Sequence, residues 1–331
     1  MNRQLSYKRI PFLINEAISL LDLDLCGKTI LTEGATGLFA ATPVIASLAG
    51  GKVFAVTKDS KFGKAADAER DVSELAKRAG VKGEITFLSR DKIPFDLIDI
   101  VTNLGFVRPI DKDFVSRLKK GSAISYMAEA WEFREGDIDL DACKKRGIPV
   151  VSTNESAPEI RVFEQVGHLA IKLLLDIGLE VFGNRIGIYS PDPFGTAIKN
   201  TLDNFGAISF FIDAKNKSFP ANLDAVIACD YKNSLPPLNP KQLKNSGSPI
   251  IFQFCGAVDF NELSRAGYCL FPETPLESGR MSFTLAELGP RPLIYLHTAG
   301  LKAGEVISNC LENNLSYEIE RQKHPVCGKE L

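Results

Sequence analysis

The sequence has no surplus of charge of either sign. Its 39 lysines and arginines nearly balance its 41 aspartates and glutamates, so the 331 residues carry a formal net charge of −2. A protein that follows a nucleic-acid backbone needs a basic excess to neutralise the phosphates. We therefore expect no nucleic-acid partner. At roughly 100 to 200 residues per domain, the length predicts two domains.

The sequence also lacks a long apolar run and an export signal. Its longest uncharged stretch, Gly34 to Gly51, contains four glycines and Pro43, which suits a loop and a short helix better than a bilayer span. The N-terminus has no apolar core followed by a small-residue cleavage site. We therefore expect a cytoplasmic protein without a membrane partner.

Cysteine patterns that build disulfide frameworks or metal sites are missing as well. The seven cysteines are scattered, odd in number and free of any CxxC pair. We interpret them as reduced thiols and expect no metal site.

Short β-rich runs alternate with amphipathic runs through most of the chain, which is typical of parallel sheets covered by helices on both faces. The pattern predicts an α/β protein of two Rossmann-like domains with a cleft between them. We expect an N-terminal domain of the substrate-binding type over residues 1–157, joined by the C-terminal segment 301–331. A linking helix over 158–182 leads to a second, nucleotide-type domain over 183–300, which ends in a strand over 293–296.

The second half resembles the D-isomer-specific 2-hydroxyacid dehydrogenases. IDLDACKKRGIPVVSTNESAPE (138–159) resembles the family's passage into its nucleotide domain, and NRIGIYSPDPFGTAIKNTLDNFGA (184–207) stands where the family has its dinucleotide loop. IIFQFCGAVDFNEL, FPETP and YLHTAG resemble the segments that carry the catalytic Arg, Glu and His. The resemblance covers roughly residues 138–304. It implies an NAD- or NADP-dependent oxidoreductase that forms a homodimer through its second domain.

The dinucleotide loop departs from the family pattern. It reads Ser190-Pro-Asp192-Pro-Phe-Gly195 and keeps only the third glycine of GxGxxG. Asp192 followed by Pro193 is a helix start signal, so a carboxylate would cap the helix end that attracts phosphates. At about 4 Å two like charges repel by about 1 kcal/mol in water and about 4 kcal/mol at an effective dielectric of 20. Asp192 is therefore either part of an altered cofactor loop or a structural cap.

Other family positions hold a mixture of expected and unexpected residues. The resemblance makes Glu273 and His297 a carboxylate–imidazole pair for proton transfer, while Cys255 replaces the Arg that binds the substrate carboxylate. A thiol cannot provide a bidentate cationic fork. Asp213 matches the position that holds the adenosine ribose, although a surface aspartate at a strand end is equally compatible. His297 could also be a structural imidazole.

The first half contains a second candidate pocket. A strand and turn ILTEGATG, with Gly34, Thr36 and Gly37, precede a strand that ends near Asp59. This is a generic pattern for holding the ribose of a nucleotide or S-adenosylmethionine, and the alternative is a tight structural turn.

Two further groups stand after predicted strands, where parallel sheets bind their ligands. Arg108 could bind a small anionic substrate. Glu129, Trp131 and Arg134 could form a polar pocket with an aromatic wall, or a solvated loop in which Trp131 packs on the domain edge.

Three hypotheses of function follow. The first is a divergent 2-hydroxyacid dehydrogenase-like oxidoreductase that acts on a small anionic metabolite in the cleft between the domains. The second is a non-redox enzyme that binds S-adenosylmethionine or another nucleotide at the GATG loop. The third is a non-catalytic binding or assembly protein that has the dehydrogenase fold.

Overall fold

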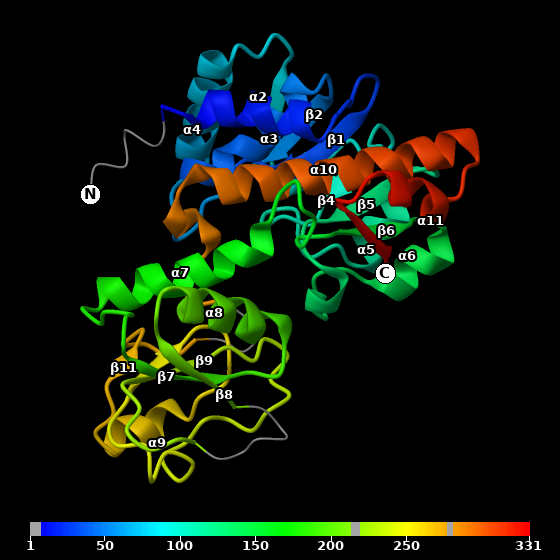
Figure 1. Cartoon of the computed structure of the whole chain (residues 1–331). Coiled ribbons are helices and arrows are strands. Elements are labelled where there is room, and N and C mark those ends of the chain that lie inside the picture. Colours follow the sequence, from blue (N-terminus) through cyan, green and yellow to red (C-terminus); the bar gives the residue numbers. More distant parts are fainter. Residues whose placement is uncertain (1–7, 213–218, 277–280) are drawn as a thin grey trace. The chain divides into compact units, whose positions relative to one another are not determined.

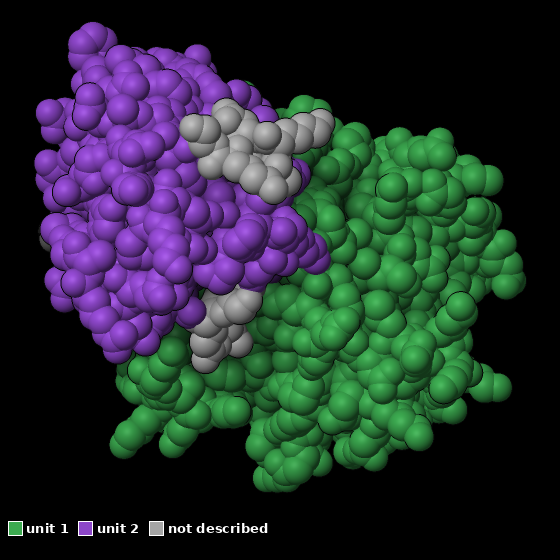
Figure 2. Space-filling view, turned by 90° about the horizontal axis from the view of Figure 1, so that it is seen from below, with its two compact units in different colours: residues 1–162, 289–331 green, residues 163–288 purple. Residues whose placement is uncertain are grey.

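The computed structural model describes residues 8–212, 219–276 and 281–331. The chain forms two compact units, shown in different colours in Figure 2. Unit 1 comprises Met1–Val162 and Gly289–Leu331, and unit 2 comprises Phe163–Leu288. No helix in the described ranges combines the length and the apolar character that crossing a bilayer requires.

Unit 1 is built on a seven-stranded sheet in the order β12-β6-β5-β4-β1-β2-β3 (Figure 1). Six strands are parallel, and β12 pairs antiparallel with β6 at the edge. The strands are β1 (Thr29–Glu33), β2 (Lys52–Val56), β3 (Ile85–Leu88), β4 (Ile100–Thr102), β5 (Ala123–Tyr126), β6 (Val150–Thr153) and β12 (Cys327–Glu330).

Helices cover both faces of this sheet because successive strand residues point to opposite sides. Leu31 and Val101 belong to the core that α5 (Lys112–Arg117) and α6 (Leu140–Arg146) cover. Ile100 faces the other way, and Gly304 of α10 (Pro290–Asn313) packs on it. The remaining elements on the α10 side or in connections are α2 (Ile10–Leu20), α3 (Ala41–Leu48), α4 (Ala65–Ala79), α11 (Tyr317–Glu320), η1 (Gly37–Ala40), η2 (Arg90–Lys92), η3 (Ala130–Glu132) and η5 (Arg321–Lys323).

The long helix α10 corrects a prediction. Residues 293–296, which we expect to form a strand, lie inside α10, so His297 is not at a strand end. Most residues of α10 are buried, including small ones such as Gly300 and Gly304, because the helix packs between the sheet and α2 (Figure 1). A helix that is buried all round shows no 3.6-residue polar pattern, and a short apolar run within it resembles a strand.

Unit 2 contains a five-stranded parallel sheet in the order β11-β10-β9-β7-β8. Helices α7 and α8 approach each other closely, since a Cβ on Gly167 would lie 1.9 Å from Oγ1 of Thr201. The elements are α7 (Val162–Asp176), β7 (Arg185–Tyr189), α8 (Pro193–Asn204), β8 (Ile208–Ile212), β9 (Ala225–Ala228), β10 (Ile250–Gln253), α9 (Phe260–Arg265), β11 (Leu270–Phe271) and η4 (Leu285–Leu288). The predicted class of two Rossmann-like α/β domains is confirmed.

The two sheets reverse their strand order at different points. In unit 1 the order runs from β1 through β2 to β3 on one side and from β4 through β5 to β6 on the other. This 3-2-1-4-5-6 arrangement is typical of dinucleotide-binding sheets, whereas unit 2 has the 2-1-3-4-5 arrangement of flavodoxin-like sheets. Ligands of open α/β sheets bind outside the carboxyl ends of the strands at such reversal points. The reversal points are β1/β4 in unit 1 and β7/β9 in unit 2.

Candidate functional site

The loop between β7 and α8 is closed by the carboxylate of Asp192. Oδ1 accepts a hydrogen bond from the backbone N–H of Phe194 at 2.9 Å and lies 3.0 Å from the Ser190 hydroxyl. Oδ2 accepts a hydrogen bond from the backbone N–H of Tyr231 at 2.6 Å. The prediction that Asp192 caps the helix and that Pro193 begins it is confirmed.

This arrangement disfavours a dinucleotide diphosphate at the loop. A phosphate at a helix N-terminus is bound by free backbone N–H groups, and Asp192 already accepts from that of Phe194. The phosphate would also meet the charge of that carboxylate. Burial raises the pKa of Asp192. Gly195 has a packing role instead, because a Cβ there would lie 2.5 Å from the Cβ of Ser190. Asp213, the predicted ribose ligand, lies outside the described residues.

His297 lies within α10 and is only 3% exposed. Its Nδ1 is 2.5 Å from Oγ1 of Thr42 in α3, and the ring of Phe39 lies 6.1 Å from the imidazole, centroid to centroid. Burial lowers the pKa of His297 to about 4, so the ring is neutral at pH 7. These contacts describe an imidazole that joins α10 to α3 inside unit 1.

The other family positions lie in unit 2. Glu273 is exposed and follows β11, and Cys255 is buried just after β10, with its backbone N–H 3.2 Å from the carbonyl of Ala228. Proton transfer between Glu273 and His297 stays a prediction, because the two residues belong to different units.

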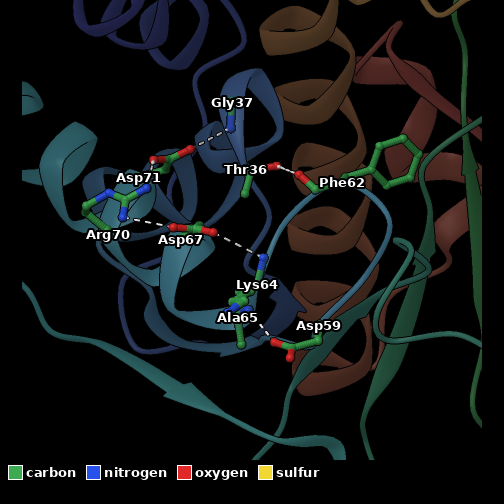
Figure 3. Close-up of polar contacts among 9 residues, drawn as sticks. All are labelled: Thr36, Gly37, Asp59, Phe62, Lys64, Ala65, Asp67, Arg70 and Asp71. Carbon is green, nitrogen blue, oxygen red and sulfur yellow. Dashed lines mark hydrogen bonds and ion pairs between the residues drawn. The ribbon is translucent and has the colours of Figure 1, made fainter.

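In unit 1, Gly34 and Thr36 lie in the loop between β1 and η1, and Gly37 is the first residue of η1. Figure 3 shows Thr36 and Gly37. A Cβ on Gly34 would lie 2.9 Å from Cγ2 of Thr57, so a glycine there lets the loop lie against the end of β2. Gly37 has a φ of +65°, which favours glycine, and its N–H donates to Oδ2 of Asp71 at 3.0 Å. Because η1 intervenes before α3, this loop does not lie at the N-terminus of an α-helix.

Asp59 lies in the turn that follows β2, beside the glycine loop. Its Oδ1 accepts a hydrogen bond from the N–H of Ala65 at 2.8 Å, at the start of α4. The hydroxyl of Thr36 donates to the carbonyl of Phe62 at 3.4 Å and thereby joins the two loops (Figure 3). Since β1 and β2 are adjacent and parallel, the structure brings Gly34, Thr36, Gly37 and Asp59 to the carboxyl ends of these two strands.

Glu33, the last residue of β1, is a polar residue at this edge that the sequence patterns do not single out. It is 6% exposed, and burial raises its pKa. Oε2 accepts a hydrogen bond from the N–H of Phe106 at 3.2 Å, in the loop after β4. Glu33 therefore lies at the β1/β4 reversal point. An acidic residue directly before the GATG loop is the signal that could have identified it.

Carboxylates dominate the polar contacts around the glycine loop. Asp71 accepts from Gly37, and Oε1 of Glu69 accepts from the Thr57 hydroxyl at 3.0 Å. The nearby cation Arg70 is shared between Asp67 at 2.9 Å and Asp71 at 3.8 Å. A diphosphate would meet like charge at this loop as well.

Arg108 approaches the same reversal point from the loop after β4. Its Nη1 lies 2.6 Å from Oδ2 of Asp137, and both side chains are largely buried. Its positive charge also opposes the rise in the pKa of Glu33. Arg108 is thus already paired within unit 1, and a substrate anion would have to compete with Asp137.

Three carboxyl groups cluster at the ends of β5 and β6. Oε1 of Glu129 accepts from the N–H of Glu155 at 2.8 Å, and Oε2 of Glu132 accepts from the N–H of Glu129 at 3.2 Å. Burial raises the pKa of Glu132 to about 7 and that of Glu155 well above its usual range. Trp131 and Arg134 are half-buried, and the Arg134 charge acts on Glu132. The carboxyl groups form an internal network that fixes this loop.

The described residues contain no group of three or more His, Cys, Asp or Glu side chains arranged to hold a metal ion.

Comparison with solved structures shows that the chain shares its fold with dipicolinate synthase chains. A dipicolinate synthase subunit from Bacillus halodurans matches with a TM-score of 0.53 and 12% identity, covering 87% of this chain and 99% of that one. A dipicolinate synthase chain from Bacillus subtilis matches with a TM-score of 0.51 and 16% identity, covering 90% of this chain and 99% of that one. A putative D-3-phosphoglycerate dehydrogenase from Ralstonia solanacearum has a TM-score of 0.48 and 13% identity, with 88% of this chain and 96% of that one covered.

The predicted resemblance is confirmed at the level of the fold. The search with models of protein families and the search of curated proteins found no match. At 12–16% identity the similarity extends to the architecture, and the chemistry has to be argued from the residues of this chain.

Proposed function

We propose that unit 1 binds an adenosine-containing cofactor without a diphosphate, of the S-adenosylmethionine type, and that the protein is a non-redox group-transfer enzyme on a dehydrogenase fold. One observation carries this proposal: the GATG loop follows β1 directly at the β1/β4 reversal of a 3-2-1-4-5-6 sheet. Asp59, the acidic residue after β2, completes the nucleoside-binding pattern.

The residues at this edge suit a nucleoside that carries positive charge. Asp59 uses Oδ1 for Ala65, so Oδ2 is the oxygen that we assign to the ribose hydroxyls. Gly34 allows the loop backbone to lie close to β2, and the carboxylate of Asp71 favours a cation over a phosphate. When bound, S-adenosylmethionine supplies an electrophilic methyl group. The carboxylate of Asp71 would attract its cationic part.

Isothermal titration of the full chain with S-adenosylmethionine and S-adenosylhomocysteine tests the proposal. We expect micromolar binding by the parent and at least tenfold weaker binding by Asp59→Ala. Asp111→Ala is the matched control, because Asp111 makes the equivalent carboxylate–backbone bond at the start of α5, to Phe114 at 2.9 Å. If the parent binds neither compound, or if both variants lose affinity equally, the proposal is wrong.

A second candidate, an NAD- or NADP-dependent dehydrogenase for a small anionic metabolite, is favoured by the fold likeness. In it Glu273 and His297 would exchange the proton and Arg108 would bind the substrate anion. Titration with NADH distinguishes the candidates. We expect no binding below about millimolar concentration by the parent, and a gain of at least tenfold in Asp192→Asn, which removes the charge at the helix end. Submillimolar NADH binding by the parent would favour the dehydrogenase.

We also propose that the chain is a homodimer formed through unit 2. The support is a set of exposed apolar side chains on this unit, since solvent-exposed clusters of this kind often mark interfaces. Phe182 is 82% and Phe205 54% exposed. The Phe182 ring lies against Gly206, the residue after Phe205, because a Cβ on Gly206 would lie 2.5 Å from that ring. Leu175, which is 55% exposed, lines one shallow hollow together with Phe205. Light scattering on the purified protein tests this.

A further inference from the structure

Phe62 is an exposed aromatic residue in the turn between β2 and α4. Its side chain is 74% exposed, although phenylalanine is usually buried. Figure 3 shows the ring standing clear of the polar contacts that surround the glycine loop. Packing within unit 1 therefore does not explain a phenylalanine at this position.

The turn that carries Phe62 is fixed by hydrogen bonds. Ser60 and Gly63 exchange two backbone hydrogen bonds, of 2.9 and 3.2 Å, and the N–H of Phe62 donates to the Ser60 hydroxyl at 3.1 Å. The Thr36 hydroxyl holds the Phe62 carbonyl. Gly63 has a φ of +150°, and a Cβ there would lie 3.2 Å from Cγ2 of Thr36, so a glycine allows the turn to meet the GATG loop. The ring is thus presented from a fixed backbone that is attached to the proposed cofactor loop.

We infer that Phe62 is the platform on which the nucleobase of the cofactor stacks. This inference rests on the proposed function, because Asp59, the proposed ribose ligand, belongs to the same turn three residues earlier. A nucleobase is a flat aromatic group joined directly to the ribose, and it stacks on phenylalanine rings whatever its identity. A bare phosphate would gain little from this apolar ring.

One competing contact has to be weighed. The ammonium of Lys61 lies 5.2 Å from the centroid of the Phe62 ring. An exposed cation–π contact of this kind changes an equilibrium constant for folding or binding by a factor of about two to five. Stacking of a base on an aromatic side chain changes it by a factor of about 5 to 150. Stacking therefore outweighs the loss of the Lys61 contact, even if the base displaces it.

The test is isothermal titration of the full chain with S-adenosylhomocysteine and with adenosine. We expect Phe62→Ala to bind both at least fivefold more weakly than the parent. Phe62→Trp should bind at least as tightly as the parent. Phe12→Ala is the matched control, because Phe12 is a 65% exposed phenylalanine in α2 of the same unit. It should leave both affinities unchanged.

A spectroscopic measurement separates stacking from a structural effect. The chain has one tryptophan, so Phe62→Trp adds one defined fluorophore. Adenosine should quench the added fluorescence with the same dissociation constant that titration gives. If the parent binds but Phe62→Ala and Phe12→Ala have equal affinities, the assignment of Phe62 is wrong and the proposed cofactor site stands. The same conclusion follows if adenosine binds Phe62→Trp without quenching its fluorescence. Absence of binding by the parent overturns the proposed cofactor site and this assignment with it.

Discussion

Oδ2 of Asp192 lies 2.6 Å from the backbone nitrogen of Tyr231, so a helix cap also holds the loop after the neighbouring strand β9. The same carboxylate accepts from Phe194 at the start of α8. One side chain therefore fixes both loops at the β7/β9 reversal of unit 2. In this chain the position where the fold favours a phosphate serves stability instead.

Replacement of Asp192 should therefore lower the free energy of unfolding by more than the loss of an ordinary helix cap does. An ordinary Asp→Ala cap change costs about 1 kcal/mol. Asp139 provides the comparison, because its side chain accepts from Ala142 alone at the start of α6. We expect urea unfolding to show a loss of about 2 kcal/mol or more for Asp192→Ala and about 1 kcal/mol for Asp139→Ala. Equal losses would show that the Tyr231 contact contributes nothing.

The buried imidazole of His297 should make stability depend on pH on the acid side. Its pKa is about 4 in the folded protein and 6.5 as the ordinary value, so the unfolded chain binds the proton first as the pH falls. The free energy of unfolding should therefore decrease from pH 6.5 to pH 4, by up to about 1.4 kcal/mol per pH unit. His297→Gln, which keeps a hydrogen-bonding side chain near Thr42, should lose most of this dependence.

The control for His297 is His168→Gln, because His168 is exposed on α7. Urea unfolding at half-unit pH steps should give the parental slope for His168→Gln. A parental slope for His297→Gln would show that another group titrates in this range.

The sequence predicts those features that depend on local signals. β7, β8 and β9 are examples, because each is a short β-rich run bounded by turn residues. The Asp-Pro pair likewise predicts the cap of α8. The bond from Tyr231 to Asp192 has no local signal, since it joins residues that are 39 positions apart.

The sequence also misjudges segments whose surroundings lie far along the chain. α10 is buried between the sheet and α2, so the polar spacing that marks a helix is absent around His297. The C-terminal segment also depends on distant partners, because its last residues form β12, which pairs with β6. In the candidate site, the GATG loop and Asp59 are predicted from their pattern. The buried position of Glu33 depends on the loop after β4.

The carboxyl groups of Glu132 and Glu155 should produce a pH dependence of the opposite sign. Burial raises the pKa of Glu132 from 4.5 to about 7, so the folded protein holds a proton that the unfolded chain has released. This contribution is fully present below pH 4.5 and is lost as the pH rises through 7. We expect the contribution of Glu132 to the free energy of unfolding to decrease between pH 5 and pH 8, against the contribution of His297 below pH 6.5.

Glu132→Gln should reduce this loss, because an amide stays neutral. Glu135→Gln is the matched control, since Glu135 is exposed three residues further along the chain. Unfolding by urea at pH 5 and pH 8 is the measurement. If Glu132→Gln shows the same difference between the two pH values as the control, the cluster does not hold a proton.

The exposed aromatic side chains of unit 2 give the last prediction, which concerns the proposed homodimer. Phe182→Asp places a charge on the apolar surface, and a buried unpaired charge in an interface is strongly unfavourable. We expect light scattering to show a dimer of about 72 kDa for the parent, given the 36.2 kDa chain, and a monomer for this variant.

Phe62→Asp is the matched control for this measurement, because Phe62 is similarly exposed but lies on unit 1. It should remain dimeric. Because Phe182 is 82% exposed, its replacement should leave the folded unit intact, and circular dichroism would verify this. A parent protein that is monomeric at micromolar concentration, or a Phe182→Asp variant that stays dimeric, would place the interface elsewhere or remove it. A monomeric Phe62→Asp together with a dimeric Phe182→Asp would move the interface to the exposed turn of unit 1 and compete with its proposed role toward a nucleobase.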